Sequence, residues 1–399
     1  MTTASPAADL CQPYHFCTYF DRHYLTRGLA LYQSLRTHCR RPFVLWTLCF
    51  DEESHAILSG LALEDMRLIR REDFEAGDAE LAAARANRTH VEYYWTCTPS
   101  LPLYVLRQDE SIDIITYLDA DLFFFSDPQP IFDEFAHGSI LIVGHRYAPA
   151  YARWLETSGI FNVGIMAFRR NAVGRECLQW WRERCNEWCY AHVADGKYGD
   201  QKYLDDWPVR FAGVVVLQHP GAGLAPWNIA RYRLEFAGTE TRVNGLPLVF
   251  FHFHALKVLS PRAMSPSAGC YGFSYPAMIA VFTPYLEALD HAAAVSGLPF
   301  VDSFASSSWL QRVRGIFSQD LWWLGSPRFA RVLWHIGGKS REARDLLESA
   351  GQSLSGCDRR AARCLILRAL MVNPLMILSK PFRVVAMRYL FVTQGSQRP

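Results

Sequence analysis

The sequence predicts an α/β fold in which helices cover both faces of a mostly parallel central sheet, with a helical region at the C-terminus. Short apolar runs of strand length alternate along the chain with segments of helical periodicity, which is typical of βαβ units. Two of the apolar runs, residues 43–48 and 112–118, are continuous, as expected for strands buried on both faces. The 399 residues suffice for one large domain and a smaller one.

The first 120 residues are expected to alternate strand and helix. Residues 15–20 form an aromatic and β-branched run that is typical of a strand. After a short loop, Leu25, Leu29, Tyr32 and Leu35 recur with the spacing of one helix face. The elements expected next are a strand at 43–48, a helix at 52–61, a strand at 66–69, an Ala-rich helix at 75–88 and a strand at 112–118.

The rest of the chain continues this alternation and then changes character. Strands are expected at 139–143, 164–168, 214–218 and 249–253, with a helix at 175–191. After about residue 285 the pattern becomes helical and more basic, so we expect a domain of residues 13–284 and a C-terminal region of residues 285–399. The segment from Cys357 onward contains eight basic residues and one acidic residue, Asp358.

Composition narrows the classes of function. A formal net charge of +2 argues against a dedicated nucleic-acid binder. The 11 cysteines show no zinc-site spacing and are expected to be reduced thiols. Residues 1–12 lack the pattern of a signal peptide, and no stretch approaches the roughly 18 to 20 apolar residues of a spanning helix. We therefore expect a cytoplasmic protein, with contact at the inner face of the membrane as an open alternative.

The strongest chemical signal is Asp119-Ala120-Asp121, which follows the apolar run at 112–118. Two carboxylates at the end of a buried strand are costly unless they are paired or bound to a metal. A divalent cation such as Mn²⁺ or Mg²⁺ prefers carboxylate oxygens and keeps positions open for phosphate oxygens. Because ligands bind at the carboxyl ends of parallel strands, Asp21 and Asp119 are expected at one edge of the sheet. The alternative is that both acids cap the next turn.

A second group of candidate ligands lies at residues 250–257. His252 and His254 alternate onto one face of the expected strand, and Lys257 lies just beyond it. A neutral imidazole can complete a carboxylate-rich metal shell, and a lysine can hold a phosphate as a point charge. The alternative is a hydrogen-bonded core histidine beside a surface lysine.

Two further segments offer polar groups for a sugar. Asn162 carries a donor and an acceptor that suit a sugar diol, and Gly164 lets a ligand approach the backbone. These two residues alternatively form a turn before a strand. In the second segment, Asp200 could interact with a lysine, a sugar hydroxyl or a helix N-terminus, and the alternative is that it caps a solvated helix.

A Pro/Gly-rich loop at residues 219–228 is a candidate acceptor site. It contains Trp227, whose ring suits stacking against a sugar, and Asn228. An ordinary long loop is the alternative. The loop lacks the spacing of a phosphate-binding Walker motif.

Taken in order, these motifs resemble the retaining glycosyltransferases of the GT-A fold, in particular glycosyltransferase family 8. The family pattern is a strand, an acidic and Tyr-containing loop, Asp-x-Asp, Phe-Asn-x-Gly, Asp-Gln, and a late His followed by Lys. All of these occur here in that order between about His15 and Leu259, roughly 60% of the chain. The resemblance implies metal-dependent transfer, with retention, from a nucleotide-diphosphate sugar such as a UDP-sugar to a glycan, lipid-linked or other hydroxyl acceptor.

The resemblance also implies roles for individual residues. The implied metal ligands are Asp119 and Asp121 with either His252 or His254. The family has an Arg before its Asp-x-Asp strand that is missing here, and Arg85 or Arg88 is the candidate substitute. The residues implied to bind the nucleotide and the donor are Tyr19, Asp21, Tyr24, Arg88, Asp119, Asp121, Asn162, Gly164 and Lys257.

Three residues are the catalytic candidates that the resemblance implies. Asp200 and Gln201 occupy the region below the anomeric carbon, and Lys257 binds the β-phosphate. The family usually spaces its His and Lys six residues apart with a Gly between them. Here the spacings are five and three, and Ala255 stands in the Gly place, so the choice between the two histidines stays open.

Two other functions compete with this interpretation. A sugar-1-phosphate nucleotidyltransferase would need a Gly-rich basic loop after the first strand, and residues 19–24 contain no glycine. A non-catalytic sugar-nucleotide-binding protein on the same fold would not need the intact Asp pair. The basic tail with its interspersed leucines either lies on an anionic membrane or packs as a helical subdomain with a solvated face.

Overall fold

The computed structural model describes residues 12–237, 240–260, 263–265, 277–300 and 322–323. The chain divides into two compact units, residues 1–261 with 266–303 and residues 262–265 with 304–399. The boundary predicted between residues 284 and 285 falls inside helix α13 (Thr283–Ser296) of the first unit, and that division stays a prediction. The basic tail that begins at Cys357 lies outside the described residues.

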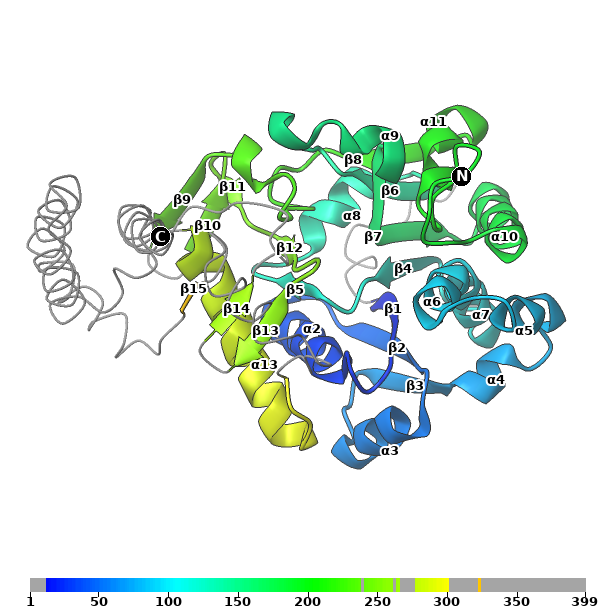
Figure 1. The fold of residues 1–399 in the computed structure, drawn as a ribbon, viewed down its shortest axis with the longest axis horizontal. Coiled ribbons are helices and arrows are strands. Elements are labelled where there is room, and N and C mark those ends of the chain that lie inside the picture. Colours follow the sequence, from blue (N-terminus) through cyan, green and yellow to red (C-terminus); the bar gives the residue numbers. More distant parts are fainter. Residues whose placement is uncertain (1–11, 238–239, 261–262, 266–276, 301–321, 324–399) are drawn as a thin grey trace, which may run out of the picture. The chain divides into compact units, whose positions relative to one another are not determined.

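The first unit is built on a seven-stranded sheet (Figure 1). Strands β3, β2, β1 and β4 run parallel to one another. Strand β7 is antiparallel to both β4 and β6, and β6 is parallel to β8. The sheet is therefore mixed and mostly parallel, as predicted. In spatial order its strands are β3 (Met66–Arg70), β2 (Phe43–Cys49), β1 (Tyr14–Phe20), β4 (Ile114–Leu118), β7 (Phe161–Arg169), β6 (Ile140–Gly144) and β8 (Val214–Leu217).

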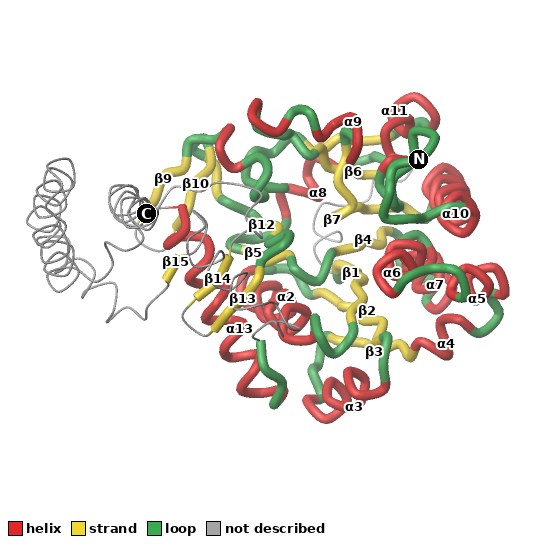
Figure 2. Tube along the Cα trace, viewed as in Figure 1, coloured by secondary structure: helices red, strands yellow, loops and turns green. Residues whose placement is uncertain are grey.

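Helices cover both faces of this sheet (Figure 2). Apolar side chains of α2 and α8 form one core with the sheet, and those of α7 and α10 form the other. The α-helices are α2 (Leu25–His38), α3 (Glu52–Leu61), α4 (Arg71–Glu75), α5 (Ala79–Arg85), α6 (His90–Cys97), α7 (Ser100–Gln108), α8 (Gln129–Phe135), α9 (Trp154–Ser158), α10 (Ala172–Glu187), α11 (Trp207–Arg210) and α13.

Alternation along the strands divides these two cores. In β1, Phe16 enters the core beside α2, whereas Cys17 enters the core beside α7. In β4, Leu118 enters the core beside α2, whereas Tyr117 enters the core beside α7. The strand that leads to Asp119 is thus packed on both faces, which explains its continuous apolar sequence.

The helix expected at residues 75–88 is wrong in its extent. The structure has α4 and α5 there, separated by a turn at Gly77, whose φ is +82°. Asp78 begins the second helix by accepting a hydrogen bond from the backbone N–H of Leu81. Glycine in the left-handed region ends a helix readily, so the helix is interrupted at Gly77 although the flanking sequence is rich in Ala.

A short antiparallel pair, β5 (Leu122–Phe124) and β12 (Phe250–His252), joins segments far apart in sequence. Leu122 lies opposite His252, and Phe123 lies opposite Phe251. The strand expected at residues 249–253 therefore exists, but it pairs outside the main sheet. This pairing brings His252 beside the Asp119-Ala120-Asp121 segment.

The remaining elements are short. Strands β9, β10 and β11 form a small antiparallel sheet, and β14 pairs with β15 in the second unit. Their bounds, with those of β13 and the irregular helices, are β9 (Leu234–Ala237), β10 (Glu240–Val243), β11 (Leu246–Pro247), β13 (Lys257–Ser260), β14 (Ala263–Ser265), β15 (Trp322–Trp323), η1 (Pro149–Tyr151), η2 (Lys202–Asp206), η3 (Ile229–Arg231) and the π-helical η4 (Met278–Phe282).

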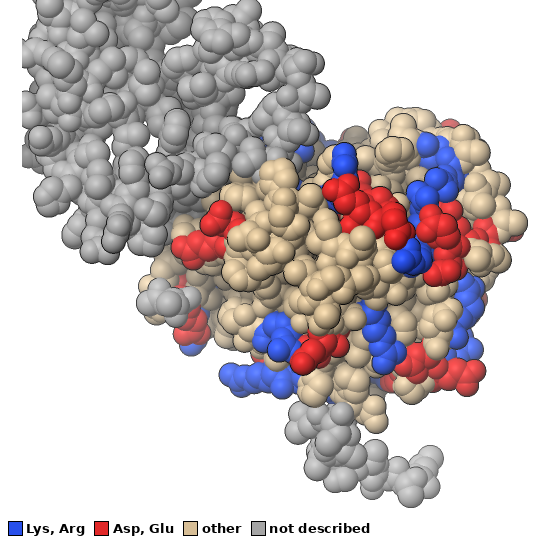
Figure 3. Space-filling model, turned by 90° about the horizontal axis from the view of Figure 1, so that it is seen from below, with Lys and Arg blue, Asp and Glu red and all other residues tan. Residues whose placement is uncertain are grey.

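The surface shows no strong charge bias on the face drawn in Figure 3. Acidic and basic side chains of the described residues stand beside one another there, consistent with the formal net charge of +2. Among the described helices, none combines the length and the apolar composition needed to cross a bilayer.

Candidate metal centre and its cavity

A cavity of about 500 Å³ opens at the edge of the sheet where β1 and β4 end and β7 begins. Asp21 and Asp119 both line it, as predicted from their positions after two strands. Asn162 joins them because β7 is antiparallel, so its first residues lie beside the carboxyl end of β4. The backbone N–H of Asp119 donates to the carbonyl of Gly164 at 2.9 Å and closes that corner.

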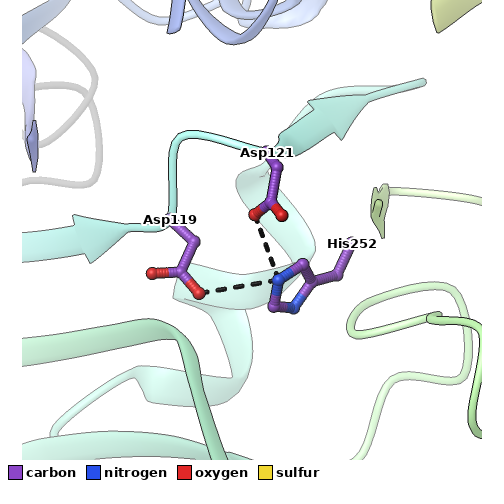
Figure 4. A group of neighbouring side chains, drawn as sticks. All are labelled: Asp119, Asp121 and His252. Atoms are coloured by element: carbon purple, nitrogen blue, oxygen red, sulfur yellow. Dashed lines mark ion pairs between the residues drawn. The ribbon is translucent and has the colours of Figure 1, made fainter. Parts of the chain in front are cut away.

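Asp119, Asp121 and His252 converge at this edge (Figure 4). The imidazole Nε2 of His252 lies 3.1 Å from Oδ1 of Asp121 and 3.5 Å from Oδ2 of Asp119. One ligand atom from each residue lies within 4.8 Å of the other two. Two carboxylates and an imidazole are a ligand set that suits divalent cations such as Mn²⁺. Within the described part of the chain, no other cluster of His, Cys, Asp and Glu meets this geometry.

The electrostatics of Asp121 and His252 favour a bound cation. Burial opposes protonation of His252, but Asp121 and Asp119 outweigh it and raise the pKa of the imidazole. Burial also raises the pKa of Asp121, yet His252 prevails and holds that pKa below its usual range. The two carboxylates therefore favour a positive charge at this point, which a proton on His252 or a bound metal ion can supply.

The structure favours His252 as the third ligand over His254. Both histidines line the cavity, but His252 is buried and points at the carboxylates, whereas His254 is exposed beyond the end of β12. Ala255, which stands in the family's glycine place, has a φ of +58°, in the left-handed region that favours glycine. The local backbone therefore follows the glycine-like conformation despite the methyl group.

The structure gives a steric reason for a glycine at position 164. A Cβ atom there would lie 2.7 Å from Nδ1 of His252 and 2.7 Å from Oδ1 of Asn162. The missing side chain thus admits the imidazole to the metal centre, and its predicted role at the donor is not tested by this contact.

We expect Gly164→Ala to weaken divalent-metal binding by about 10- to 100-fold, the usual cost of disturbing the support of a ligand. The added methyl must displace His252 or Asn162. Isothermal titration calorimetry with Mn²⁺ measures the effect. Gly60→Ala is the matched control, because a Cβ there meets no atom within 4 Å. Equal affinity in both variants would contradict the steric role.

The β1 end of the cavity holds the side chains predicted to contact a base. Asp21 accepts hydrogen bonds from the backbone N–H of His23 at 2.9 Å and from the hydroxyl of Tyr94 at 3.0 Å. Tyr24 is 39% exposed, and the guanidinium of Arg27 lies 4.6 Å from its ring centre. Tyr24 therefore offers an accessible aromatic surface with a cation packed against the ring.

Asp200 is buried in the cavity wall, and Gln201 lines the cavity next to it. Burial raises the pKa of the Asp200 carboxyl to about 7. Oγ1 of Thr98 lies 2.9 Å from Oδ2 of Asp200, and the indole of Trp181 donates to the Asp200 carbonyl. The helix-capping alternative does not apply, since Asp200 precedes η2 without capping it.

The structure does not place Asn228 among the residues that line the cavity, and its acceptor contact stays a prediction. Its side chain is fully buried, accepts from the backbone N–H of Ala225 and donates to the carbonyls of His145 and Gly223. Through these hydrogen bonds, the side-chain amide of Asn228 stabilises the loop at residues 219–228. Trp227 does line the cavity, but it is only 4% exposed. Its ring packs edge-on against three imidazoles, those of His145, His252 and His254.

Arg88 and Lys257 are not among the residues that line the cavity. The guanidinium of Arg88 lies over the ring of Tyr190 at 3.9 Å and donates to the carbonyl of Asn186. The predicted substitution of Arg88 for the missing family arginine stays a prediction. Lys257 is exposed at the start of β13. Its role at a β-phosphate stays a prediction.

Sequence reasoning missed several residues of the site. Arg27 does not line the cavity, but it is buried, and its charge is one of the influences that lower the pKa of Asp121. A buried arginine in the first turn of a helix that follows an acidic loop gives only a weak signal in sequence. Cavity residues that sequence reasoning missed include His90, Trp95, His145, Tyr147, Trp154 and Tyr198.

Solved structures that the chain is similar to include two glycosyltransferases. Galactosyltransferase LgtC, in complex with donor and acceptor sugar analogs, shares 14% identity at a TM-score of 0.43, covering 75% of this chain and 99% of LgtC. Mouse xyloside xylosyltransferase 1 shares 13% identity at a TM-score of 0.39, covering 60% of this chain and 97% of the mouse protein.

Sequence comparison gives nearer relatives, although no family model matches the chain. The uncharacterized protein YfnD of Bacillus subtilis is 31% identical over 251 residues, which are 62% of this chain and 80% of YfnD. The uncharacterized protein YfnF of the same organism is 31% identical over 252 residues, 61% of this chain and 82% of YfnF. The chain belongs to the same protein family as YfnD and YfnF.

Proposed function

We propose that the protein is a metal-dependent glycosyltransferase that uses a nucleoside-diphosphate sugar. The observation that carries the proposal is the convergence of Asp119, Asp121 and His252 at one edge of the cavity. Among the described residues that line this cavity there are four aspartates and no lysine or arginine. A diphosphate would be repelled by these carboxylates, so its binding requires a cation held between them and the phosphates.

The order of strands supports an extended donor. Asp21 follows β1, Asp119 follows β4, Asn162 begins β7 and His145 follows β6, and these four strands are neighbours in that order. Neighbouring strands lie about 4.8 Å apart, so β1 and β6 are separated by roughly 14 Å. A base at Tyr24, a diphosphate at the metal centre and a sugar near Asn162 fit this span.

The proposed reaction breaks the bond between the sugar C1 and the diphosphate and forms one between C1 and an acceptor oxygen. Its products are the glycoside, the nucleoside diphosphate and a proton. The bound cation would stabilise the negative charge on the leaving diphosphate. Asp200 and Gln201 line the cavity, and in this proposal they would face the sugar as it gains positive charge. If the acceptor attacks from the leaving-group side, the configuration is retained.

A panel of nucleotide sugars tests this proposal. Release of the nucleoside diphosphate is measured with Mn²⁺, with Mg²⁺ and after chelation, in the presence of glycan and lipid-linked acceptors. We expect release from one donor class only when a divalent ion is present. Metal-dependent nucleotide binding without release from any donor would favour the non-catalytic alternative. Absence of metal-dependent nucleotide binding in calorimetry would refute both interpretations.

Location and membrane contact remain part of the proposal. A cytoplasmic protein that touches the inner face of the membrane through its basic tail would meet lipid-linked acceptors there. Co-sedimentation of the full chain with vesicles containing anionic lipid, compared with a chain that ends at Gly356, tests this point.

A further inference from the structure

The imidazole of His145 is held in one orientation just beyond the end of β6. Its backbone N–H donates to the carbonyl of Ile160 at 2.9 Å, and its own carbonyl accepts from Nδ2 of Asn228 at 3.0 Å. The ring stacks on that of Tyr147, with ring centres 4.7 Å apart, and the ring of Trp227 packs edge-on against it at 5.3 Å. Both the backbone and the ring of His145 are therefore fixed before any ligand binds.

A hydrogen bond of this ring determines which of its two nitrogens carries the proton. Nδ1 of His145 lies 3.0 Å from the carbonyl oxygen of Gly159. A carbonyl oxygen can only accept, so Nδ1 carries the proton and donates it to this bond. Burial lowers the pKa of the imidazole to about 3, so the ring is neutral at physiological pH. Nε2 is therefore left with a lone pair and can only accept a hydrogen bond.

Nε2 of His145 is accessible from the cavity. The ring lines the cavity, although the residue is only 3% exposed. Nε2 makes no hydrogen bond within the described part of the chain, yet it is not one of the fully buried polar atoms, so it is open to the cavity. A largely desolvated acceptor without a partner is unfavourable, so this nitrogen favours a ligand that brings an O–H or N–H group.

His145 lies on the side of the cavity where the proposed function places the sugar. Strand β6 pairs with β7, and Val143 of β6 lies opposite Asn162. The ring of Trp227 contacts both His145 and His252, with ring centres 5.3 Å apart in each case. The two imidazoles are therefore close neighbours in the cavity wall. A sugar attached to a diphosphate at the metal centre would come within reach of His145.

We propose that His145 is a specificity-determining residue whose Nε2 accepts a hydrogen bond from a hydroxyl of the transferred sugar. This inference rests on the proposed function and deepens it by naming a group that the protein recognises on the sugar. A nitrogen that only accepts attracts a hydroxyl and repels a carboxylate. Among the described residues that line the cavity, no lysine or arginine could bind a carboxylate instead. The transferred sugar is therefore a neutral, hydroxylated sugar and not a uronic acid.

Two substitutions of His145 separate recognition of the sugar from support of the fold. Asparagine places its amide nitrogen near the position of Nδ1 and can still donate to Gly159, but it offers nothing at the position of Nε2. Glutamine reaches the position of Nε2 and can accept there, but it cannot replace Nδ1. His145→Asn should therefore lose the contact with the sugar, and His145→Gln should retain it. A purely structural role of the ring predicts the opposite order.

Isothermal titration calorimetry of the full chain with saturating Mg²⁺ measures this contact. The probes are UDP-glucose, UDP-galactose, dTDP-glucose and GDP-mannose, each compared with its parent nucleoside diphosphate. We expect at least one sugar nucleotide to bind more tightly than its parent. His145→Asn should reduce this advantage by about 3- to 10-fold, the usual worth of one neutral hydrogen bond, and leave the affinity of the parent unchanged. His145→Gln should preserve the advantage.

Monodeoxy analogues of the tightest-binding sugar nucleotide identify the hydroxyl. One analogue should bind the unmodified protein about 3- to 10-fold more weakly than the complete sugar nucleotide does. In His145→Asn the same analogue and the complete sugar nucleotide should bind equally, because the two changes remove one and the same contact. If every analogue lost as much affinity in His145→Asn as in the unmodified protein, the inference would be wrong.

Nitrogen-15 NMR of the histidine rings tests the tautomer without a ligand. The signals of His145 are assigned by their loss in His145→Asn, and we expect a protonated Nδ1 and an unprotonated Nε2. His137→Asn is the matched control for binding, because His137 is exposed and does not line the cavity. Thermal unfolding of each variant reports whether it is folded.

The outcomes separate this inference from the proposed function. A protonated Nε2 would overturn the inference. So would sugar nucleotides that bind no more tightly than their parents, or equal losses of both in folded His145→Asn. Failure of every nucleoside diphosphate to bind with Mg²⁺ would instead refute the proposed function on which the inference rests.

Discussion

Asp121→Asn is expected to reduce metal-dependent nucleotide binding and turnover by about 100-fold or more. The amide keeps the shape of the carboxylate but removes its charge, which a divalent ion needs more than a neutral oxygen. Disturbing an outer support of a ligand typically costs about 10- to 100-fold, so loss of a ligand should cost at least the upper value. Two calorimetric titrations measure the loss of binding. The first adds Mn²⁺ to the protein, and the second adds nucleoside diphosphate with Mn²⁺ present.

The same substitution has a second expected effect, on His252. Asp121 is the main influence that raises the pKa of that imidazole against burial, so the variant should hold His252 neutral. Asp206→Asn is the control, because Asp206 is exposed and pairs with Arg210 on the surface. Equal Mn²⁺ affinity in the two variants would rule out Asp121 as a metal ligand.

Asp200→Asn is expected to raise the free energy of unfolding above neutral pH. This gain in stability should decrease as the pH falls. In the folded protein the Asp200 pKa is raised from 3.8 to about 7. The folded state therefore holds a proton that the unfolded state releases between these values, so stability declines as pH rises through this window. The difference corresponds to about 4 kcal/mol at full ionisation, which asparagine avoids.

Urea unfolding at about pH 5 and about pH 8 measures this effect. The advantage of Asp200→Asn over the unmodified protein should grow by about 2–4 kcal/mol between these conditions. Asp206→Asn again serves as the control, since an exposed carboxylate changes stability little. A constant difference between the two pH values would contradict a raised pKa at Asp200.

Much of the fold is readable from periodicity, because apolar spacing records which faces are buried. The alternation predicted from the first strand through β4 matches the structure with two exceptions. One residue with positive φ, Gly77, divides a predicted helix, and the helices α6 and α7 were not predicted. Periodicity does not reveal pairing partners. The direction of β7 and the pairing of β12 with β5 depend on contacts between distant segments, which local sequence does not encode.

The candidate site divides in the same way. Asp119 and Asp121 were predictable because their chemistry is specific and Asp119 follows a buried strand. The sequence also offered a histidine ligand, but the choice of His252 over His254 required the structure. Asn228 shows the limit, since its polar side chain serves the backbone of its own loop. His145 and Tyr198 became cavity residues only through the packing of their segments, and no spacing in the sequence marks them.

The pairing of β5 with β12 also orders events while the protein is being made. The ribosome releases Asp119 and Asp121 long before His252, which comes more than a hundred residues later. Until β12 emerges and pairs with β5, the nascent chain has the two acids without their imidazole partner. Such a distant closure is slow to form, so metal capture should coincide with a late step of folding. The cation would then select completed chains over truncated ones.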